Sequence, residues 1–143
     1  MKFLLHRLRV AIERINPKIN KMAKKKEIKQ GDVWMVDLSI DSIDHEQSGI
    51  RPCIVLQQNH LNDTSGNVMI APITSQLKKE QPFHYFLYKE NYPFFSKSKN
   101  IVLTECMTCV SKGRLERLLG KVFYKDITGI IENMKYVFIK KED

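Results

Sequence analysis

The part of the chain from residue 31 onward is a series of short runs rich in β-branched and aromatic residues, separated by polar or turn-forming segments. Runs of this length are typical of short strands, and no helical segment recurs between them as it does in βα units. The spacing therefore predicts a small barrel or a strongly curved sheet. The predicted strands are Val33–Leu38, Pro52–Leu56, Val68–Ile73, Phe83–Tyr88, Ile101–Thr104 and Leu118–Phe123.

Two helices are predicted to accompany the strands. A short one is expected around Ser111–Leu115, and a longer one from about Lys125 to Phe138. Asp126 lies near the start of the longer helix, where a carboxylate can cap free backbone N–H groups. The predicted fold class is mainly β (α+β): a small β barrel with a short helix and a C-terminal helix. The longer helix is predicted from apolar residues at helical spacing, which are Ile127, Ile130, Ile131, Met134, Val137 and Phe138.

The first 30 residues form a basic segment that precedes the strands. They contain ten Lys and Arg but only Glu13 and Glu27, a balance of +8 that equals the net charge of the whole 143-residue chain. The remaining residues carry 14 charges of each sign. We therefore divide the chain into residues 1–29, a basic helix and Lys-rich linker, and residues 30–143, a neutral barrel domain.

The basic segment also carries an apolar stripe. Its members recur at helical spacing, and Pro17 is expected to end the helix near Ile15. A basic amphipathic helix can contact nucleic acid, lie on a membrane surface, or pack its stripe on its own domain or on a partner subunit. The sequence leaves these alternatives open. The stripe consists of Leu4, Leu8, Ala11, Ile12, Ile15 and Ile19.

We expect neither a membrane-spanning helix nor a secretion signal in this sequence. No apolar run approaches the ~20 residues that a spanning helix needs. The apolar start Phe3–Leu5 is interrupted by His6 and Arg7 before the core of a signal can form. Three cysteines are too few for a disulfide framework. We therefore expect a cytoplasmic protein with reduced cysteines.

Two features suggest metal or redox chemistry, and both have a plainer interpretation. Cys106 and Cys109 have the spacing of a zinc or dithiol pair, but there is no second pair beside the single Cys53, and the four histidines have no ligand spacing. The acidic patch has no second cluster to complete a metal site. We expect no metal and no cofactor, with the acidic patch as a solvated loop. This patch is Asp41, Asp44 and Glu46.

Two polar segments at strand ends are candidates for binding phosphate. Arg51 follows a polar, glycine-containing loop and precedes Pro52, and arginine presents a planar fork suited to a phosphate group. Thr74, Ser75 and Gln76 end another strand with three hydrogen-bonding side chains in a row. Separately, these residues are compatible with a surface ion pair and a turn cap. Together they can line one groove.

In order and spacing, four segments resemble the MazF/PemK toxins of bacterial toxin–antitoxin pairs. The resemblance extends from about Ile28 to Lys140 and leaves out the basic front. The segments are Gly31–Asp37, similar to the family's opening strand; His45–Leu56, similar to its Glu-Gln-x-Gly-x-Arg-Pro-x-Val-Val signature; Asn59–Asn67, similar to its Asn-x-x-(Ser/Thr)-Gly turn; and Ala71–Gln76, similar to its Pro-Ile-Thr-Ser motif.

The resemblance implies an SH3-like barrel, usually a homodimer, that cleaves single-stranded RNA without metal. In such cleavage the 2′-hydroxyl attacks the adjacent phosphate and leaves a 2′,3′-cyclic phosphate and a 5′-hydroxyl. Arg51 matches the family's catalytic Arg, a stabiliser of developing charge and candidate general acid, and Thr74 matches its catalytic Thr. An antitoxin partner, acidic and partly disordered, is also implied. The residues expected to contact or position RNA are His45, Glu46, Gln47, Ser75, Gln76 and Glu105.

One segment departs from the family pattern, which commonly reads Glu-Gln-x-Arg-Thr-x-Asp-Lys. Glu105 and Lys112 are kept, but the positions of Gln, Arg, Thr and Asp are changed. A second hypothesis therefore stays open: a non-catalytic module of the same fold that binds RNA, DNA or a protein. The residues at the changed positions are Cys106, Thr108, Cys109 and Ser111.

Overall fold

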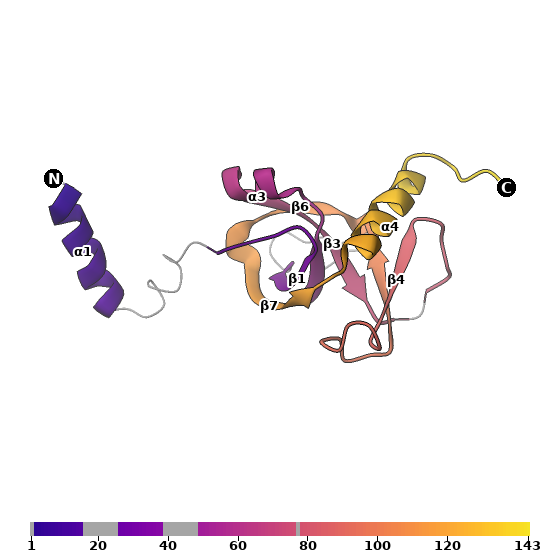
Figure 1. The fold of residues 1–143 in the computed structure, drawn as a ribbon, viewed down its shortest axis with the longest axis horizontal. Helices are drawn as coiled ribbons and strands as arrows, with labels where there is room; N and C mark the ends of the chain where they lie inside the picture. Colours follow the sequence, from indigo (N-terminus) through magenta and orange to yellow (C-terminus); the bar gives the residue numbers. More distant parts are fainter. Residues whose placement is uncertain (1, 16–25, 39–48, 77) are drawn as a thin grey trace.

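The computed structural model describes residues 2–15, 26–38, 49–76 and 78–143 (Figure 1). Three α-helices are described, with seven strands and three short 3-10 helices between and after them. In chain order the helices and strands are α1 (Lys2–Ile15), β1 (Asp32–Asp37), β2 (Ile50–Val55), α3 (Asn59–Thr64), β3 (Asn67–Thr74), β4 (His84–Tyr88), β5 (Lys99–Leu103), β6 (Thr108–Ser111), β7 (Leu115–Lys121) and α4 (Tyr124–Met134).

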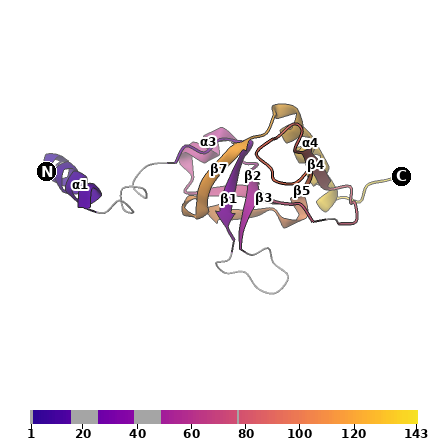
Figure 2. The same cartoon turned by 90° about the horizontal axis from the view of Figure 1, so that it is seen from below.

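The strands form one antiparallel sheet in the order β4-β5-β3-β2-β1-β7, with β6 paired to β3. Figures 1 and 2 show the sheet curving back on itself, although the strand order has two free ends. β3 changes partner along its length, from β6 at Asn67–Ile70 to β5 at Ile73–Thr74. Pro72, which has no N–H to donate, lies between these two ladders. The predicted mainly β fold is confirmed, as a curved open sheet.

Each face of the curved sheet carries its own apolar cluster, because alternate residues of a strand point to opposite faces. On one face Val33 pairs with Ile54, and Ile54 with Ala71. On the other, Trp34 pairs with Cys53. The central strands β1, β2 and β3 are therefore buried on both sides over much of their length, and they read as almost continuous apolar runs.

The second cluster extends into the segment that precedes β1. Ile28 is only 2% exposed and belongs to this cluster. Lys26 Nζ donates to the carbonyl oxygen of Leu115, and Gln30 Nε2 donates to that of Leu56 over 2.8 Å. The packed unit, called the β domain below, therefore begins at Lys26, inside the segment that the sequence assigns to a linker.

Helix α4 covers the end of the sheet near β4, in the yellow part of the chain (Figure 1). Its Ile127 and Ile130 are buried in the first cluster. Asp126 accepts hydrogen bonds from two tyrosine hydroxyls: that of Tyr85, at 2.6 Å, and that of Tyr92. The predicted helix is confirmed, but it ends at Met134 and is followed by a 3-10 turn at Lys135–Val137, so Phe138 is outside it and exposed. The Asp126 carboxylate lies in its first turn and also holds it to the sheet and the 89–98 loop.

Three short elements differ from the prediction. The segment predicted as a turn contains α3, because Asn62 is buried and its Nδ2 donates to the carbonyl oxygen of Gln57 at 2.8 Å. β6 was not predicted. The helix expected around Ser111–Leu115 is a single 3-10 turn, Lys112–Arg114, because β6 and β7 take the residues on either side.

The amphipathic helix predicted at the front is present as α1. Its leucines are exposed: Leu4 is 65% exposed and Leu8 is 52% exposed. Both views show α1 standing apart from the β domain (Figures 1 and 2). The described members of the stripe, Leu4, Leu8 and Ala11, therefore do not pack on the β domain in this structure. Among the described residues, no helix is long and apolar enough to cross a membrane.

Candidate active site

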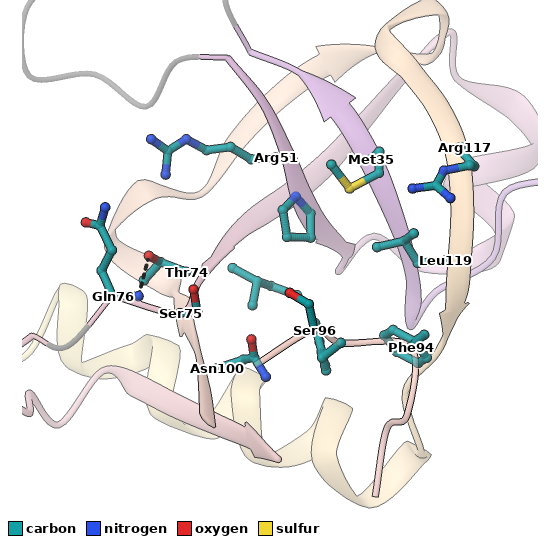
Figure 3. Close-up of a pocket in the computed structure, with 13 residues that line it drawn as sticks. Met35, Arg51, Thr74, Ser75, Gln76, Phe94, Ser96, Asn100, Arg117 and Leu119 are labelled. Carbon is teal, nitrogen blue, oxygen red and sulfur yellow. Dashed lines mark hydrogen bonds between the residues drawn. The ribbon is translucent and has the colours of Figure 1, made fainter. Parts of the chain in front are cut away.

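A pocket of about 390 Å³ opens beside the strands β1, β2, β3 and β7 and the loop before β5 (Figure 3). Its polar end carries Arg51 and Thr74, and its apolar end carries Met35, Leu119 and Phe94 (Figure 3). This volume is in the usual range for a small-molecule or single-nucleotide site. The complete lining is Met35, Arg51, Pro52, Ile73, Thr74, Ser75, Gln76, Phe94, Phe95, Ser96, Asn100, Arg117 and Leu119.

Strand pairing accounts for the meeting of Arg51 and Thr74. The β2–β3 ladder pairs Cys53 with Pro72. Arg51 and Thr74 each lie two residues beyond this last pair, so the ladder brings both residues to the same end of the two strands. Both residues line the pocket, and Figure 3 shows them at the same end of it. Two segments that are 23 positions apart in sequence thus converge, as the phosphate-groove prediction requires.

The polar end is held by the backbone around it. The backbone N–H of Gln76 donates to Thr74 Oγ1 over 3.1 Å, which fixes the position of a hydroxyl that is otherwise buried (Figure 3). Thr74 keeps its own O–H proton for a ligand, because a hydroxyl donates and accepts at once. Ser75 and Gln76 are exposed at the mouth.

Cys53, two residues after Arg51, has a fully buried thiol. Its Sγ is 3.6 Å from the carbonyl oxygen of Arg51. Burial raises the pKa of the Cys53 thiol to about 12, although the positive charge of Arg51 acts in the opposite direction. A thiol with that pKa is neutral at pH 7 and unreactive. The chemistry available at this end of the pocket is therefore that of a guanidinium and hydroxyls.

The 89–98 loop supplies the aromatic rings of the apolar end. Phe94 and Phe95 lie 4.7 Å apart between ring centroids, and a Cβ on Gly120 would come within 2.3 Å of Phe94. Only glycine at position 120 therefore admits this ring. Asn100 is buried at the floor, and its Nδ2 donates to the carbonyl oxygens of Leu87 and Lys97, at 3.3 and 3.0 Å.

A second cation stands at the apolar end. Arg117 of β7 pairs with Met35 of β1 and lines the pocket with it (Figure 3). A guanidinium fork binds an anion at one end, and an aromatic and thioether surface receives a flat ring at the other. The pocket therefore has the groups needed to hold a phosphodiester together with an adjoining base.

The other predicted site residues lie elsewhere. Glu105 is not part of the pocket lining; its carboxylate lies 3.2 Å from Nε2 of buried His84. The positions of His45, Glu46 and Gln47 are outside the described residues, as are Asp41 and Asp44 of the acidic patch. A role in RNA binding for these residues stays a prediction.

The sequence reasoning missed Phe94, Asn100 and Arg117. Phe94 had a signal, because Tyr92-Pro93-Phe94-Phe95 is an aromatic run inside a loop that is otherwise polar. Such a run folds back onto an apolar surface rather than into water. A single arginine or asparagine in a strand gives no comparable signal.

The cysteine pair stays outside the site. Cys106 and Cys109 are free thiols near β6, and neither lines the pocket. The part of the chain that the structure describes contains no group of three or more metal-ligating side chains.

A family model described as "PemK-like, MazF-like toxin of type II toxin-antitoxin system" matches residues 29–138. The chain belongs to this family. The resemblance deduced from the motifs is therefore confirmed. The matched range contains every element from β1 to α4 and leaves out α1.

Relatives of this toxin agree in sequence and in fold. Endoribonuclease EndoA of Bacillus subtilis (strain 168) is 34% identical over 100 residues, which are 69% of this chain and 81% of that protein. The crystal structure of MazF (Form-I) from Deinococcus radiodurans has a TM-score of 0.66 at 20% identity, over 80% of this chain and 98% of that one. A mycobacterial endoribonuclease in complex with its cognate antitoxin has a TM-score of 0.62 at 16% identity, over 81% of this chain and 99% of that one.

The departure from the family pattern lies away from the pocket. None of the residues from Glu105 to Lys112 lines it. Thr108 and Cys109, two of the changed positions, lie in β6 opposite Ile70 and Met69 of β3. The changed segment therefore leaves the lining of the Arg51–Thr74 pocket intact.

Proposed function

We propose that Arg51 and Thr74 form the catalytic centre with which this toxin cleaves single-stranded RNA. The observation that carries the proposal is that the two residues line one pocket, just beyond the end of the β2–β3 ladder. Membership of the toxin family and the likeness to EndoA support RNA as the substrate and cleavage as the reaction.

The reaction that suits these groups is an internal transfer and needs no metal. The RNA 2′-oxygen forms a bond to the adjacent phosphorus, and the bond from phosphorus to the 5′-oxygen breaks. The 2′-hydroxyl loses one proton to the surrounding solvent and the leaving 5′-oxygen gains one, so the step takes up no net proton. Products are a 2′,3′-cyclic phosphate and a 5′-hydroxyl. No atom from water or a cofactor enters this step.

Arg51 has the clearest role in this scheme. Two negative oxygens develop on phosphorus in the transition state, and a guanidinium beside them stabilises that charge more than it stabilises the ground state. Arg51 is also the candidate donor of the proton that the leaving oxygen takes up. Thr74 donates a hydrogen bond to the phosphate, since its oxygen already accepts from the backbone of Gln76.

The apolar half of the pocket suits the base next to the reacting phosphate. Phe94 offers a ring for stacking, which contributes about 1–3 kcal/mol per base in single-strand binding sites. Arg117 adds a contact to a neighbouring phosphate or base edge. A single-stranded substrate follows from this arrangement, because a base paired in a duplex cannot enter the pocket.

An antitoxin and a second copy of the chain are the proposed partners. The mycobacterial relative is in complex with its cognate antitoxin. For this chain, we expect an acidic, partly disordered segment that covers the pocket and pairs with Arg51 and Arg117. Assembly as a homodimer in the cytoplasm belongs to the same proposal.

Cleavage in EDTA tests the proposal. The purified full-length chain is incubated with single-stranded RNA, and the new ends are identified chemically. We expect 2′,3′-cyclic phosphate and 5′-hydroxyl ends, and no cut at a 2′-deoxy nucleotide. Intact RNA at high enzyme concentration contradicts the proposal.

Thr74→Ala sharpens the test. Loss of one hydrogen bond to the reacting phosphate is expected to slow cleavage about tenfold to a hundredfold. Thr128→Ala is the matched control, because Thr128 is exposed on α4 and its hydroxyl donates only to the carbonyl oxygen of Lys125 among the bonds described. Equal rates for the two variants would remove Thr74 from the mechanism.

The changed segment Glu105–Lys112 supports one alternative, a non-catalytic binding module. Tight RNA binding without new ends, unaffected by Thr74→Ala, is the result that favours it.

A further inference from the structure

Helix α1 has exposed leucines at one face and cations on both sides of it. At 100° per residue, Leu4, Leu5 and Leu8 fall within one arc of the helix, and Lys2 and Arg7 border that arc on opposite sides. Leu5 is 64% exposed, close to the value for Leu4. Phe3, in the first turn, is 86% exposed. The described helix thus presents apolar surface to solvent with positive charge along both edges.

This combination distinguishes between the possible anionic surfaces. An RNA backbone is bound by cations and hydrogen-bond donors, and gives no reason to leave leucines uncovered. A bilayer with anionic lipids takes both features at once: apolar side chains enter the boundary between headgroups and acyl chains, and Lys and Arg lie against the lipid phosphates. The long stems of Lys and Arg allow this arrangement, because they reach outward along an apolar surface.

We propose that α1 is a membrane-surface anchor, which holds this toxin on anionic lipid with Leu4, Leu5 and Leu8 inserted and Lys2 and Arg7 at the phosphates. The helix does not span the bilayer, since its 14 residues reach about 21 Å against a hydrocarbon core of about 30 Å. It lies in the plane of the interface.

Charge in the rest of the basic segment adds to the attraction. Residues 1–30 carry the entire +8, and residues 16–25 alone contain Lys18, Lys21, Lys24 and Lys25. Each Lys or Arg close to an anionic surface strengthens binding roughly fivefold. The β domain, which begins at Lys26 on its contact with Leu115, keeps its pocket independent of the anchor.

Co-sedimentation of the full-length protein with lipid vesicles tests the anchor. Vesicles of phosphatidylcholine with phosphatidylglycerol are compared with pure phosphatidylcholine, with no RNA present. We expect sedimentation with the anionic vesicles only, weakening as salt is raised. Absence of sedimentation with anionic vesicles overturns the proposal.

Two variants separate the parts of the anchor. L4E/L8E is expected to abolish vesicle binding, and K2Q/R7Q to weaken it by roughly tenfold or more. K140Q/K141Q removes the same charge from exposed residues at the C-terminal end and is expected to leave binding within about twofold. A loss as large in this control as in K2Q/R7Q shows that net charge alone attracts the protein, and overturns the anchor.

RNA or a second copy of the chain, in place of lipid, would give different results. If K2Q/R7Q lowers the salt slope of RNA binding while L4E/L8E leaves vesicle binding unchanged, α1 contacts RNA and the proposal fails. If L4E/L8E changes the mass in light scattering and vesicles are not bound, a second copy covers the leucines and the proposal fails. RNA cleavage by L4E/L8E is expected to equal that of the wild type, so the anchor and the proposed ribonuclease fail independently.

Discussion

The two long helices, α1 and α4, are both amphipathic, yet their apolar faces meet different surroundings. In α4, Ile130 is completely buried against the sheet. In α1, Leu4 and Leu8 are more than half exposed. Helical periodicity predicts both helices equally well, because it reports only that a helix has an apolar side. It does not say which surface covers that side.

The residues around each stripe explain the difference. α4 has Asp126 in its first turn, and the Asp126 carboxylate accepts hydrogen bonds from the hydroxyls of Tyr85 and Tyr92. Gly129 allows the Tyr85 ring to lie against the helix. α1 begins with Lys2 and has Arg7 beside its leucines. The helix that packs on the β domain is held there by buried hydrogen bonds. The helix that we propose to bind lipid has cations beside its apolar side chains.

The largest contrast in stability is expected between Ile130→Ala and Leu8→Ala. Truncation of Ile130 leaves a cavity in the core, which lowers the free energy of unfolding by about 2–5 kcal/mol. Truncation of Leu8, which is exposed, leaves no cavity. Urea unfolding of both variants measures the difference. A loss above about 1 kcal/mol for Leu8→Ala would mean that α1 packs on the β domain after all.

A smaller effect is expected at the aromatic wall of the pocket. Gly120→Ala places a methyl group within 2.3 Å of Phe94, and overpacking of this kind costs about 1–3 kcal/mol. Because Phe94 must move, RNA cleavage is expected to fall as well. Gly66→Ala is the matched control, since nothing lies within 4 Å of its added carbon. Equal stability and cleavage in the two variants would show that Phe94 moves aside without cost, and would contradict this prediction.

The hydrogen bonds from Tyr85 and Tyr92 to Asp126 of α4 make the stability of the fold depend on pH. Burial and the Asp126 carboxylate raise the pKa of Tyr92 to about 12, and raise that of Tyr85. Between pH 10 and 12 the unfolded chain loses the Tyr92 proton while the folded chain keeps it, so the folded state loses stability as pH rises through this window. Melting temperatures at pH 8 to 12 measure this.

Two tyrosine substitutions test whether Tyr92 causes this loss of stability at high pH. Tyr92→Phe is expected to cost about 1 kcal/mol at pH 8 and to make the alkaline decline shallower, with the contribution of Tyr85 remaining. Tyr124→Phe, at an exposed tyrosine of the same helix, is expected to change neither. If the decline is as steep in Tyr92→Phe as in the wild type, the Tyr92–Asp126 hydrogen bond is not its cause.

The sequence predicted those parts of the fold whose local pattern matches their final environment. Strand-like runs such as Val33–Leu38 and the stripe of α4 are of this kind. α3 was missed because asparagine and glycine in a polar segment are typical of a turn. The helix depends on Asn62, which is buried and donates to the carbonyl oxygen of Gln57. β6 was missed because Thr108–Ser111 is short and has only Val110 buried.

The candidate site divides in the same way. Arg51 and Thr74 could be predicted from the sequence, because they are polar residues at strand ends. The order of the family motifs pointed to the same two residues. Their meeting depends on a register, and the contribution of Arg117 depends on β7 lying beside β1, which is long-range pairing that a local pattern does not encode. Phe94 enters the pocket through the space that Gly120 leaves.

The initial rate of RNA cleavage in EDTA by full-length Arg51→Ala, beside Arg7→Ala, tests the central claim most directly. Both changes remove one arginine, the first from the pocket and the second from α1. We predict a rate at least about a hundredfold below the wild type for Arg51→Ala, because it removes the group that stabilises charge on phosphorus, and a rate within about twofold for Arg7→Ala. Wild-type cleavage by Arg51→Ala would contradict the account.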